Sequence, residues 1–184
     1  GLTVDRLFAD GFDAIFIGTG TAVPQDMNGT PGAQLRGVSQ GTYLLHCVSS
    51  YTSGAIGRRL VPVKKGERVA VIGGGNVAMD TARTAIRLGG DVTVVYRRRQ
   101  EDMPAIESEY REAVDEGVKF MWQSTAIEFV GDEKNRLTAL HLNTPEGETT
   151  VAFDRVFLAI GSKPADRIVS TTSGIEVDEK GYVK

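Results

Sequence analysis

Cysteine, basic charge and long apolar runs are all scarce in this chain of 184 residues. The lone cysteine, Cys47, excludes an internal disulfide and any metal cluster held by cysteines alone. No apolar run approaches the roughly 20 residues of a membrane-spanning helix. The first ten residues hold two Asp and one Arg, unlike a signal peptide. The net charge of −3 argues against a general nucleic-acid binder. These absences favour a cytoplasmic protein without nucleic-acid or membrane partners.

The composition is that of an ordinary folded protein with a clustered excess of glycine. Hydrophobic residues make up 41% and charged residues 24%, which is enough to build a core, so we expect one domain with or without appendages. Several of the glycines stand together at Gly73-Gly74-Gly75. That cluster is the most informative feature of the sequence.

A strand, a glycine turn, a helix and a second strand surround this cluster. Residues 68–72 are a β-branched run of strand length, and residues 76–88 have helical spacing of apolar positions before Gly89-Gly90. Residues 91–96 form the next strand. Such a unit predicts a right-handed crossover between two parallel strands.

The rest of the chain predicts further elements around this unit. We expect helices at 40–50 and 104–116, buried strands at 12–17, 118–122 and 155–160, and an antiparallel meander at 126–130, 137–143 and 149–153. In the first helix, Tyr43, Leu44 and Val48 are expected to share one face.

The glycine cluster fits the pattern G-x-G-x-x-G/A at residues 73–78. Gly73 permits the tight turn, Gly75 lets the backbone approach a pyrophosphate, and Ala78 lets the helix pack close to the strand. The helix N-terminus supplies N–H groups that suit phosphate. The candidate pyrophosphate-binding residues are Gly73, Gly74, Gly75, Asn76, Val77 and Ala78. The alternative is a glycine turn without a ligand.

Three arginines follow the second strand, where NAD-binding proteins usually have a carboxylate for the ribose 2′-hydroxyl. Arg97, Arg98 and Arg99 would instead attract a 2′-phosphate. We therefore expect NADP (as NADPH), with NAD the less favoured cofactor. The alternative is that the arginines form a solvated basic patch.

The end of the strand at 155–160 supplies the remaining candidates. Ala159, Ile160 and Gly161 are expected to line the nicotinamide side of the site. The sequence predicts no catalytic side chain and no metal site, because His46 and His141 are isolated and no metal-ligand spacing occurs.

Four runs together resemble a known family: residues 71–85 (VIGGGNVAMDTARTA), 94–99 (VVYRRR), 103–105 (MPA) and 116–118 (EGV). They resemble the small (beta) subunit family of NADPH-dependent glutamate synthase, within the FAD-dependent pyridine nucleotide-disulfide oxidoreductase superfamily, and the related part of dihydropyrimidine dehydrogenase. The resemblance implies hydride transfer from NADPH to FAD. Electrons then pass to iron–sulfur clusters or a partner subunit.

The resemblance also implies the domain organisation. In that family an NAD(P)H domain is inserted between two halves of an FAD domain, so we expect residues 1–35 to end the first half, 36–162 to bind NAD(P) and 163–184 to begin the second half. The expected fold class is α/β: a Rossmann-like three-layer NAD(P)-binding domain with a central parallel sheet and an antiparallel β-meander, plus remnants of a split FAD-binding domain.

The family's FAD-binding glycine motif and iron–sulfur cysteines do not occur in this sequence, so the chain looks like a fragment. We expect it to bind NADP(H) but not to turn over alone. Its partners would be the FAD-binding domain and an iron–sulfur domain or subunit, and self-association could cover the face left open. Two alternatives remain: a non-catalytic, regulatory dinucleotide-binding module and a stand-alone nicotinamide dehydrogenase.

Overall fold

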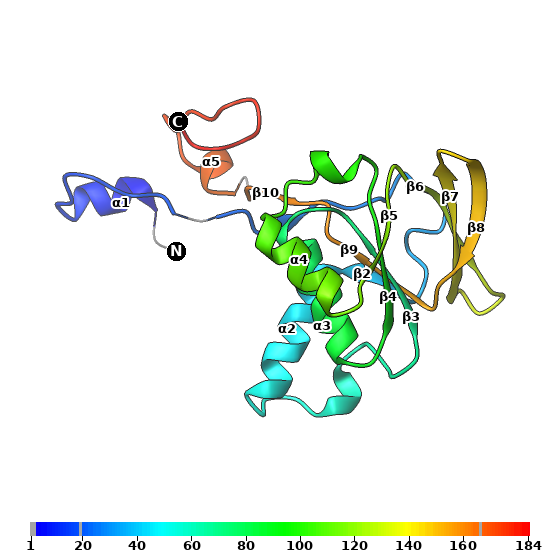
Figure 1. Cartoon of the computed structure of the whole chain (residues 1–184). Helices are drawn as coiled ribbons and strands as arrows, with labels where there is room; N and C mark the ends of the chain where they lie inside the picture. The colour runs from blue at the N-terminus through cyan, green and yellow to red at the C-terminus, as the bar shows by residue number, and fades with distance from the viewer. Residues whose placement is uncertain (1–2, 19, 166) are drawn as a thin grey trace. The chain divides into compact units, whose positions relative to one another are not determined.

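The computed structural model in Figure 1 describes residues 3–18, 20–165 and 167–184. The chain divides into two compact units, one of residues 26–161 and one formed by the segments before Asp26 and after Gly161. The assignment of residues 1–35 and 163–184 to a flavin-binding domain stays a prediction. No helix in the described ranges is long and apolar enough to cross a membrane.

The larger unit contains most of the regular structure. Its elements are β2 (Val38–Gln40), α2 (Gly41–Thr52), the 3-10 turn η1 (Arg58–Leu60), β3 (Arg68–Ile72), α3 (Asn76–Arg87), β4 (Asp91–Val95), the 3-10 turn η2 (Gln100–Asp102), α4 (Glu107–Asp115), β5 (Lys119–Met121), β6 (Thr125–Gly131), β7 (Leu137–Thr144), β8 (Gly147–Ala152) and β9 (Arg155–Leu158).

Five of these strands form a parallel sheet in the order β2-β9-β3-β4-β5. The predicted parallel pair is β3 with β4, in register from Arg68 beside Asp91 to Ile72 beside Val95. The last strand of the unit, β9, lies between β2 and β3. The chain therefore extends the sheet from β3 through β4 to β5 and then returns to the other side of β3. This change of direction creates a topological switch point at the carboxyl ends of β3 and β9.

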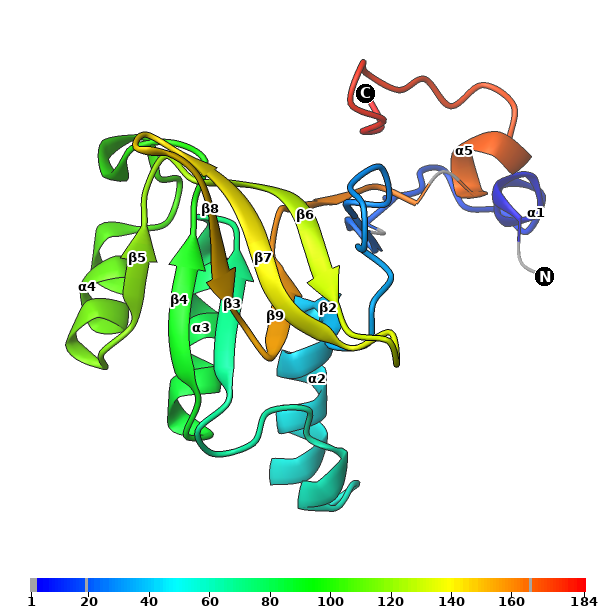
Figure 2. The same ribbon diagram turned by 90° about the vertical axis from the view of Figure 1, so that its right-hand side faces the viewer.

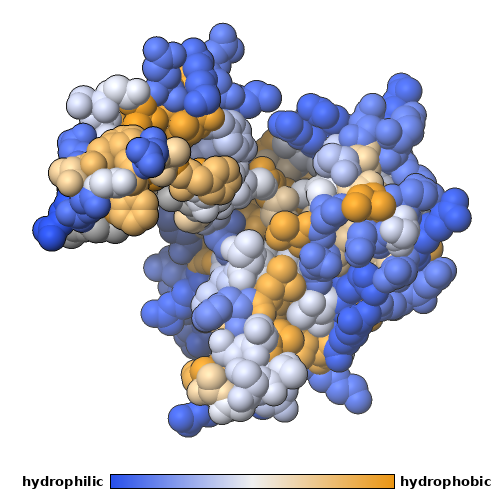
Figure 3. Space-filling view, turned by 90° about the vertical axis from the view of Figure 1, so that its left-hand side faces the viewer, coloured by the Kyte–Doolittle hydropathy of each residue, from blue (hydrophilic) through white to orange (hydrophobic). Residues whose placement is uncertain are grey.

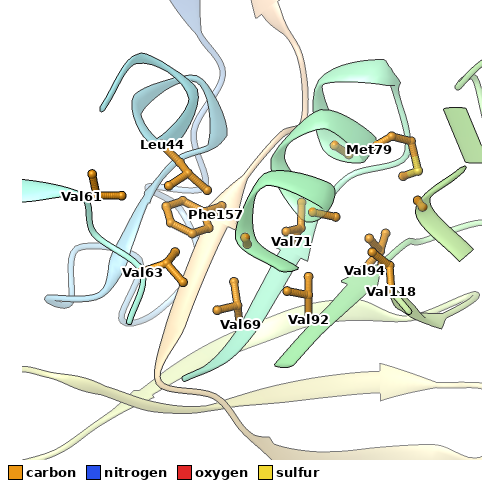
Figure 4. Close-up of a cluster of buried hydrophobic side chains, with 14 residues drawn as sticks. Leu44, Val61, Val63, Val69, Val71, Met79, Val92, Val94, Val118 and Phe157 are labelled. Carbon is orange, nitrogen blue, oxygen red and sulfur yellow. The ribbon is translucent and has the colours of Figure 1, made fainter. Parts of the chain in front are cut away.

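Alternating residues of β3 face two different layers. Val69 and Val71 pack with the helices, whereas Ala70 and Ile72 pack on the opposite face of the sheet. Both faces are covered, so the strand is apolar at nearly every position, as expected for a buried parallel strand. Figure 4 shows the helix-side core, where Leu44 of α2 and Met79 of α3 meet the sheet.

The opposite face is covered by the antiparallel sheet β6-β7-β8, seen in front of the parallel strands in Figure 2. Phe129, Leu140 and Leu142 from this sheet pack with Val156 and Leu158 of β9. Helices, parallel sheet and meander thus make three layers. The predicted α/β class, with a central parallel sheet and a β-meander, is confirmed.

Two predicted helices differ in detail from those observed. In α2, Leu44 is buried and Val48 packs beside it, but Tyr43 is 50% exposed and does not share their face. The helix expected from residue 104 begins at Glu107. The backbone N–H groups of Ala105 and Ile106 are held outside the helix by hydrogen bonds to the glycine loop, which delays its start.

An ion-pair network joins α3 to α4. The guanidinium of Arg83 lies within 3.0 Å of the carboxylates of Glu109, Glu112 and Glu116, and Arg87 also pairs with Glu116. Hydrogen bonds from Arg87 and then Arg83 hold the pKa of Glu116 below its ordinary value. The network orients α4 against the helix that follows the glycine loop.

The smaller unit contains α1 (Val4–Ala9), α5 (Arg167–Thr171) and the antiparallel pair of β1 (Val23–Pro24) with β10 (Ser162–Lys163). The buried strand expected at 12–17 is wrong: no strand forms there, and Phe16 is 95% exposed. An apolar run becomes a parallel strand only where neighbouring strands satisfy its N–H and C=O groups. No described strand pairs with this run.

Candidate functional site

Three predicted groups of site residues follow three adjacent parallel strands. The glycine loop follows β3, the arginines follow β4, and Ala159 to Gly161 follow β9. Ile72 at the end of β3 lies beside Val95 on one side and Leu158 on the other. The structure therefore brings the three groups together at the carboxyl edge of the sheet, at its switch point, where open α/β sheets bind ligands.

Gly73 makes the turn out of β3 in a conformation that requires glycine. Its φ is +142°, and a Cβ there would lie 2.2 Å from the carbonyl oxygen of Ala159. Its N–H donates to the carbonyl of Val95 at 3.2 Å. Gly73 thus allows the loop to lie tightly between the ends of β4 and β9.

Gly75 has a different role, because a Cβ there would meet nothing within 4 Å. It precedes α3 in an extended conformation, and no side chain caps the helix. The N–H groups of Ala78 and Met79 donate to the Gly75 carbonyl, whereas those of Asn76 and Val77 have no acceptor among the described residues. Free N–H groups beside a backbone without a side chain form a place where a phosphate can approach.

The middle of the glycine loop is tied to the segment before α4. A Cβ on Gly74 would lie 2.5 Å from the Tyr96 ring, so this glycine is required by packing. The carbonyl of Gly74 accepts the N–H of Ala105 at 3.0 Å, and Oδ1 of Asn76 accepts the N–H of Ile106 at 2.9 Å. The side chain of Asn76, predicted to bind the nucleotide, is therefore engaged with the protein, and only its backbone N–H remains available.

Sequence reasoning missed the role of the segment from Met103 to Ile106. The MPA run contributed to the family resemblance, but nothing in its residue types revealed that it lies against the glycine loop. Its contacts join residues 30 positions apart. The co-occurrence of GGGN and MPA was the only available signal.

The three arginines are exposed. Arg99 lies 3.8 Å from the Glu101 carboxylate, with both side chains about two-thirds exposed, whereas Arg97 and Arg98 have no ion-pair partner in the described part of the chain. Their backbone is fixed, because the carbonyls of Arg98 and Tyr96 accept the N–H groups of Gln123 and Ser124. Two guanidinium groups without an ion-pair partner among the described residues thus lie on an ordered turn beside the glycine loop.

The residues after β9 diverge to both sides of the sheet. Ala159 donates its N–H to the carbonyl of Ile72 at 2.8 Å and packs against the helix-side core. Ile160 packs toward the meander, and Gly161 is exposed with a φ of +97°. Of the three residues, only Gly161 is exposed.

Other candidate groups lie outside this edge or are engaged. Beyond the arginines a shallow depression of about 280 Å³ is lined by Gln100, Glu101, Met103, Ala105, Glu107 and Tyr110. Trp122 stacks on Phe120 with ring centroids 4.9 Å apart. Cys47 is buried, and Nε2 of His141 lies 3.3 Å from the Glu148 carboxylate. Within the described ranges no group of three or more His, Cys, Asp or Glu could hold a metal ion.

The sequence of this chain is similar to those of known oxidoreductases. The family model described as pyridine nucleotide-disulphide oxidoreductase matches residues 3–184. The glutamate synthase [NADPH] small chain of Halomonas elongata is 35% identical over 94% of this chain, which spans 40% of that relative.

Solved structures of thioredoxin reductases have a similar fold. The Lactococcus lactis enzyme is 26% identical, with a TM-score of 0.62 over 88% of this chain and 46% of that chain. The T. acidophilum enzyme, at 22% identity, shares the fold with a TM-score of 0.68 over 89% of this chain and 49% of that chain. The chain therefore spans less than half the length of these proteins.

Proposed function

Because this chain belongs to the pyridine nucleotide-disulphide oxidoreductase family, we propose that it is the NADPH-binding module of an FAD-dependent oxidoreductase. The intact protein would pass hydride from NADPH to FAD, and electrons onward to iron–sulfur clusters or a partner, as the resemblance to the glutamate synthase small subunit implies. A cytoplasmic location belongs to the same proposal.

The residues at the carboxyl edge of the sheet fit a dinucleotide. The N–H groups of Asn76 and Val77 would donate to the pyrophosphate, which can approach closely because Gly75 has no side chain. Bound NADPH supplies the hydride; the chain binds and orients it. Gly161 would lie on the nicotinamide side, with Ala159 and Ile160 supporting the backbone there.

The free arginines are the feature that favours NADPH over NADH. Arg97 and Arg98 have no carboxylate partner among the described residues, so they can bind a 2′-phosphate without first breaking an ion pair. Arg99 is a lesser candidate, because it already lies near Glu101. The name of the Halomonas elongata relative includes NADPH, which supports the same choice.

The described residues do not form a complete FAD site by themselves. In the smaller unit the described residues form no strand–glycine turn–helix unit like that of residues 68–87. Phe8, Phe12 and Phe16 are more than half exposed there, and Tyr182 is 45% exposed. Figure 3 shows hydrophobic residues at the surface of the face that it draws. We propose that segments the relatives have beyond the matched part cover such residues and hold FAD.

The single observation that supports the proposal most strongly is that the uncapped N-terminus of α3 lies at the same edge of the sheet as two arginines without an ion-pair partner among the described residues. Titration of the purified chain with NADPH and with NADH by calorimetry tests it. We expect NADPH to bind at least about tenfold more tightly, which corresponds to about 1.4 kcal/mol.

A double variant separates the two parts of the site. Arg97→Ala with Arg98→Ala should abolish most of the preference for NADPH and leave NADH affinity nearly unchanged. Preference of the wild-type chain for NADH would overturn the role of the arginines, and binding of neither nucleotide would overturn the module itself.

A further inference from the structure

We propose that Asn76 is a positioning residue, which sets the separation between the glycine loop and the arginine-bearing loop and thereby the preference for NADPH. The inference rests on the proposed function, since it concerns how the same site selects its nucleotide. It assigns the selectivity partly to a side chain that would contact neither phosphate.

Two hydrogen bonds tie the glycine loop to the segment that follows the arginines, and a third closes the arginine-bearing segment itself. Oδ1 of Asn76 accepts from the N–H of Ile106 at 2.9 Å, and the carbonyl of Gly74 accepts from the N–H of Ala105 at 3.0 Å. The hydroxyl of Tyr96 donates to the carbonyl of Asp102 at 2.8 Å. The arginines lie on the segment between Tyr96 and Asp102, so both ends of the segment are fixed relative to the glycine loop.

Tyr96 also contacts the glycine loop directly. Its ring is nearly buried, and it occupies the space that a Cβ on Gly74 would need. Trp122 packs edge-on against the same ring at 6.3 Å between centroids. The start of the arginine segment is therefore fixed by packing, and its far end depends on the hydrogen bonds of Asn76 and Gly74.

The side chain of Asn76 has no local function that would explain it. Asparagine near a helix start usually bonds to the backbone of its own helix, but here it reaches residue 106, which is 30 positions away. A single exposed hydrogen bond of this kind contributes modestly to stability. That is enough to hold a loop but a small part of the stability of the fold.

The consequence for binding differs between the two nucleotides. NADPH would contact the glycine loop through its pyrophosphate and the arginine segment through its 2′-phosphate, so its affinity depends on the separation of the two loops. NADH lacks the second contact, so its affinity depends mainly on the glycine loop. Loosening the tether should therefore lower the ratio of NADPH affinity to NADH affinity.

Four variants of the full chain test this by calorimetry and by hydrogen exchange of the Ala105 and Ile106 amides. Asn76→Ala removes the acceptor, Asn76→Asp keeps an acceptor oxygen, and Tyr96→Phe removes only the hydroxyl. The matched control, Asp132→Ala, removes a similar tether in the turn between β6 and β7, where Oδ1 of Asp132 accepts the N–H groups of Lys134 and Arg136.

We expect Asn76→Ala and Tyr96→Phe to lower the affinity ratio about threefold to tenfold, the loss of one hydrogen bond. In Asn76→Ala the Ile106 amide should also exchange faster. Asn76→Asp should retain the affinity ratio and the protection of the Ile106 amide, although its negative charge lowers the affinity for both nucleotides. Asp132→Ala should change neither the affinity ratio nor the protection of the Ile106 amide.

The outcomes distinguish the inference from the proposed function. A wild-type chain that binds neither nucleotide overturns both. A wild-type chain that prefers NADPH, with an unchanged ratio in Asn76→Ala and in Tyr96→Phe, overturns only the positioning role. Faster exchange at Ile106 without a change in the ratio would show that the bond is structural and would likewise overturn it.

Discussion

The two edges of the parallel sheet use arginine in opposite ways. At the amino edge, Arg68 binds the Asp154 carboxylate through two nitrogens at 2.9 and 2.6 Å. Arg155 binds the Glu67 carboxylate at 3.0 and 3.1 Å. At the carboxyl edge, Arg97 and Arg98 have no carboxylate partner among the described residues. An arginine whose charge is already neutralised supports the fold, whereas an unpaired one can bind an anion.

The three glycines of the loop after β3 also differ in role, some supporting the fold and one leaving room for a ligand. Gly73 is held against the Ala159 carbonyl, and Gly74 against Tyr96, whereas Gly75 faces open space. The first two are required to build the edge, and the third would be required only by a ligand. The comparison between structural and binding residues can therefore be tested inside a single loop.

The largest expected effect is that of Gly73→Ala on stability. A Cβ would lie 2.2 Å from a backbone oxygen at a φ of +142°, so the loop must move. We expect a loss of roughly 3 kcal/mol in the free energy of unfolding. Urea unfolding monitored by the fluorescence of Trp122, the one tryptophan of the chain, measures this in the larger unit.

The matched control is Gly75→Ala. Its Cβ meets nothing within 4 Å, so stability should change by less than about 0.5 kcal/mol, as for an ordinary surface substitution. Nucleotide affinity should nevertheless fall, because the methyl group would occupy the approach of the pyrophosphate. Equal loss of stability in both variants would remove the distinction between the two glycines.

Local signals in the sequence were sufficient for most of the larger unit. The alternation of Val69, Ala70, Val71 and Ile72, followed by glycine, predicted β3 within its observed bounds. The three candidate groups lie at one edge because each follows a parallel strand, and parallel strands end at the same edge of a sheet. The family resemblance is confirmed by the match over residues 3–184.

The predictions that failed depended on distant partners. The run at 12–17 looked like β3 in composition, yet without paired neighbours it forms no strand and leaves Phe16 exposed. The ion pairs of Arg83 with Glu109 and Glu112 join two helices and had no local signature, whereas the pair of Glu107 with Arg111 follows helical spacing within α4. The bond from Asn76 to Ile106 had no local signature.

A smaller effect is expected from Arg155→Ala at the amino edge. The pair with Glu67 is bidentate, with both side chains less than one-fifth exposed, so its loss should cost about 1 kcal/mol of unfolding free energy. NADPH affinity should not change, because the pair lies at the opposite edge from the arginines after β4. Arg155→Lys keeps the charge but not the second hydrogen bond, so its stability should lie between that of the wild type and that of Arg155→Ala. A marked loss of NADPH affinity in Arg155→Ala would show that the two edges are coupled.

The smallest effect concerns pH and the other amino-edge pair. Hydrogen bonds from the Arg68 side chain, with a further one from its backbone N–H, hold the pKa of Asp154 below its ordinary value of 3.8, although partial burial opposes them. The unfolded chain therefore takes up this proton at a higher pH than the folded chain. The pair stabilises the fold above that ordinary value, and its contribution disappears as the pH falls through the lowered value. Asp154→Asn should be less stable than the wild type at about pH 6, and the difference should shrink as the pH falls below 3.8 and through the lowered pKa of Asp154. Other carboxylates with lowered pKa values, such as Glu116, titrate in both proteins and cancel in the comparison. A difference in unfolding free energy that stays constant over this range would mean that Asp154 contributes through packing and not through its charge.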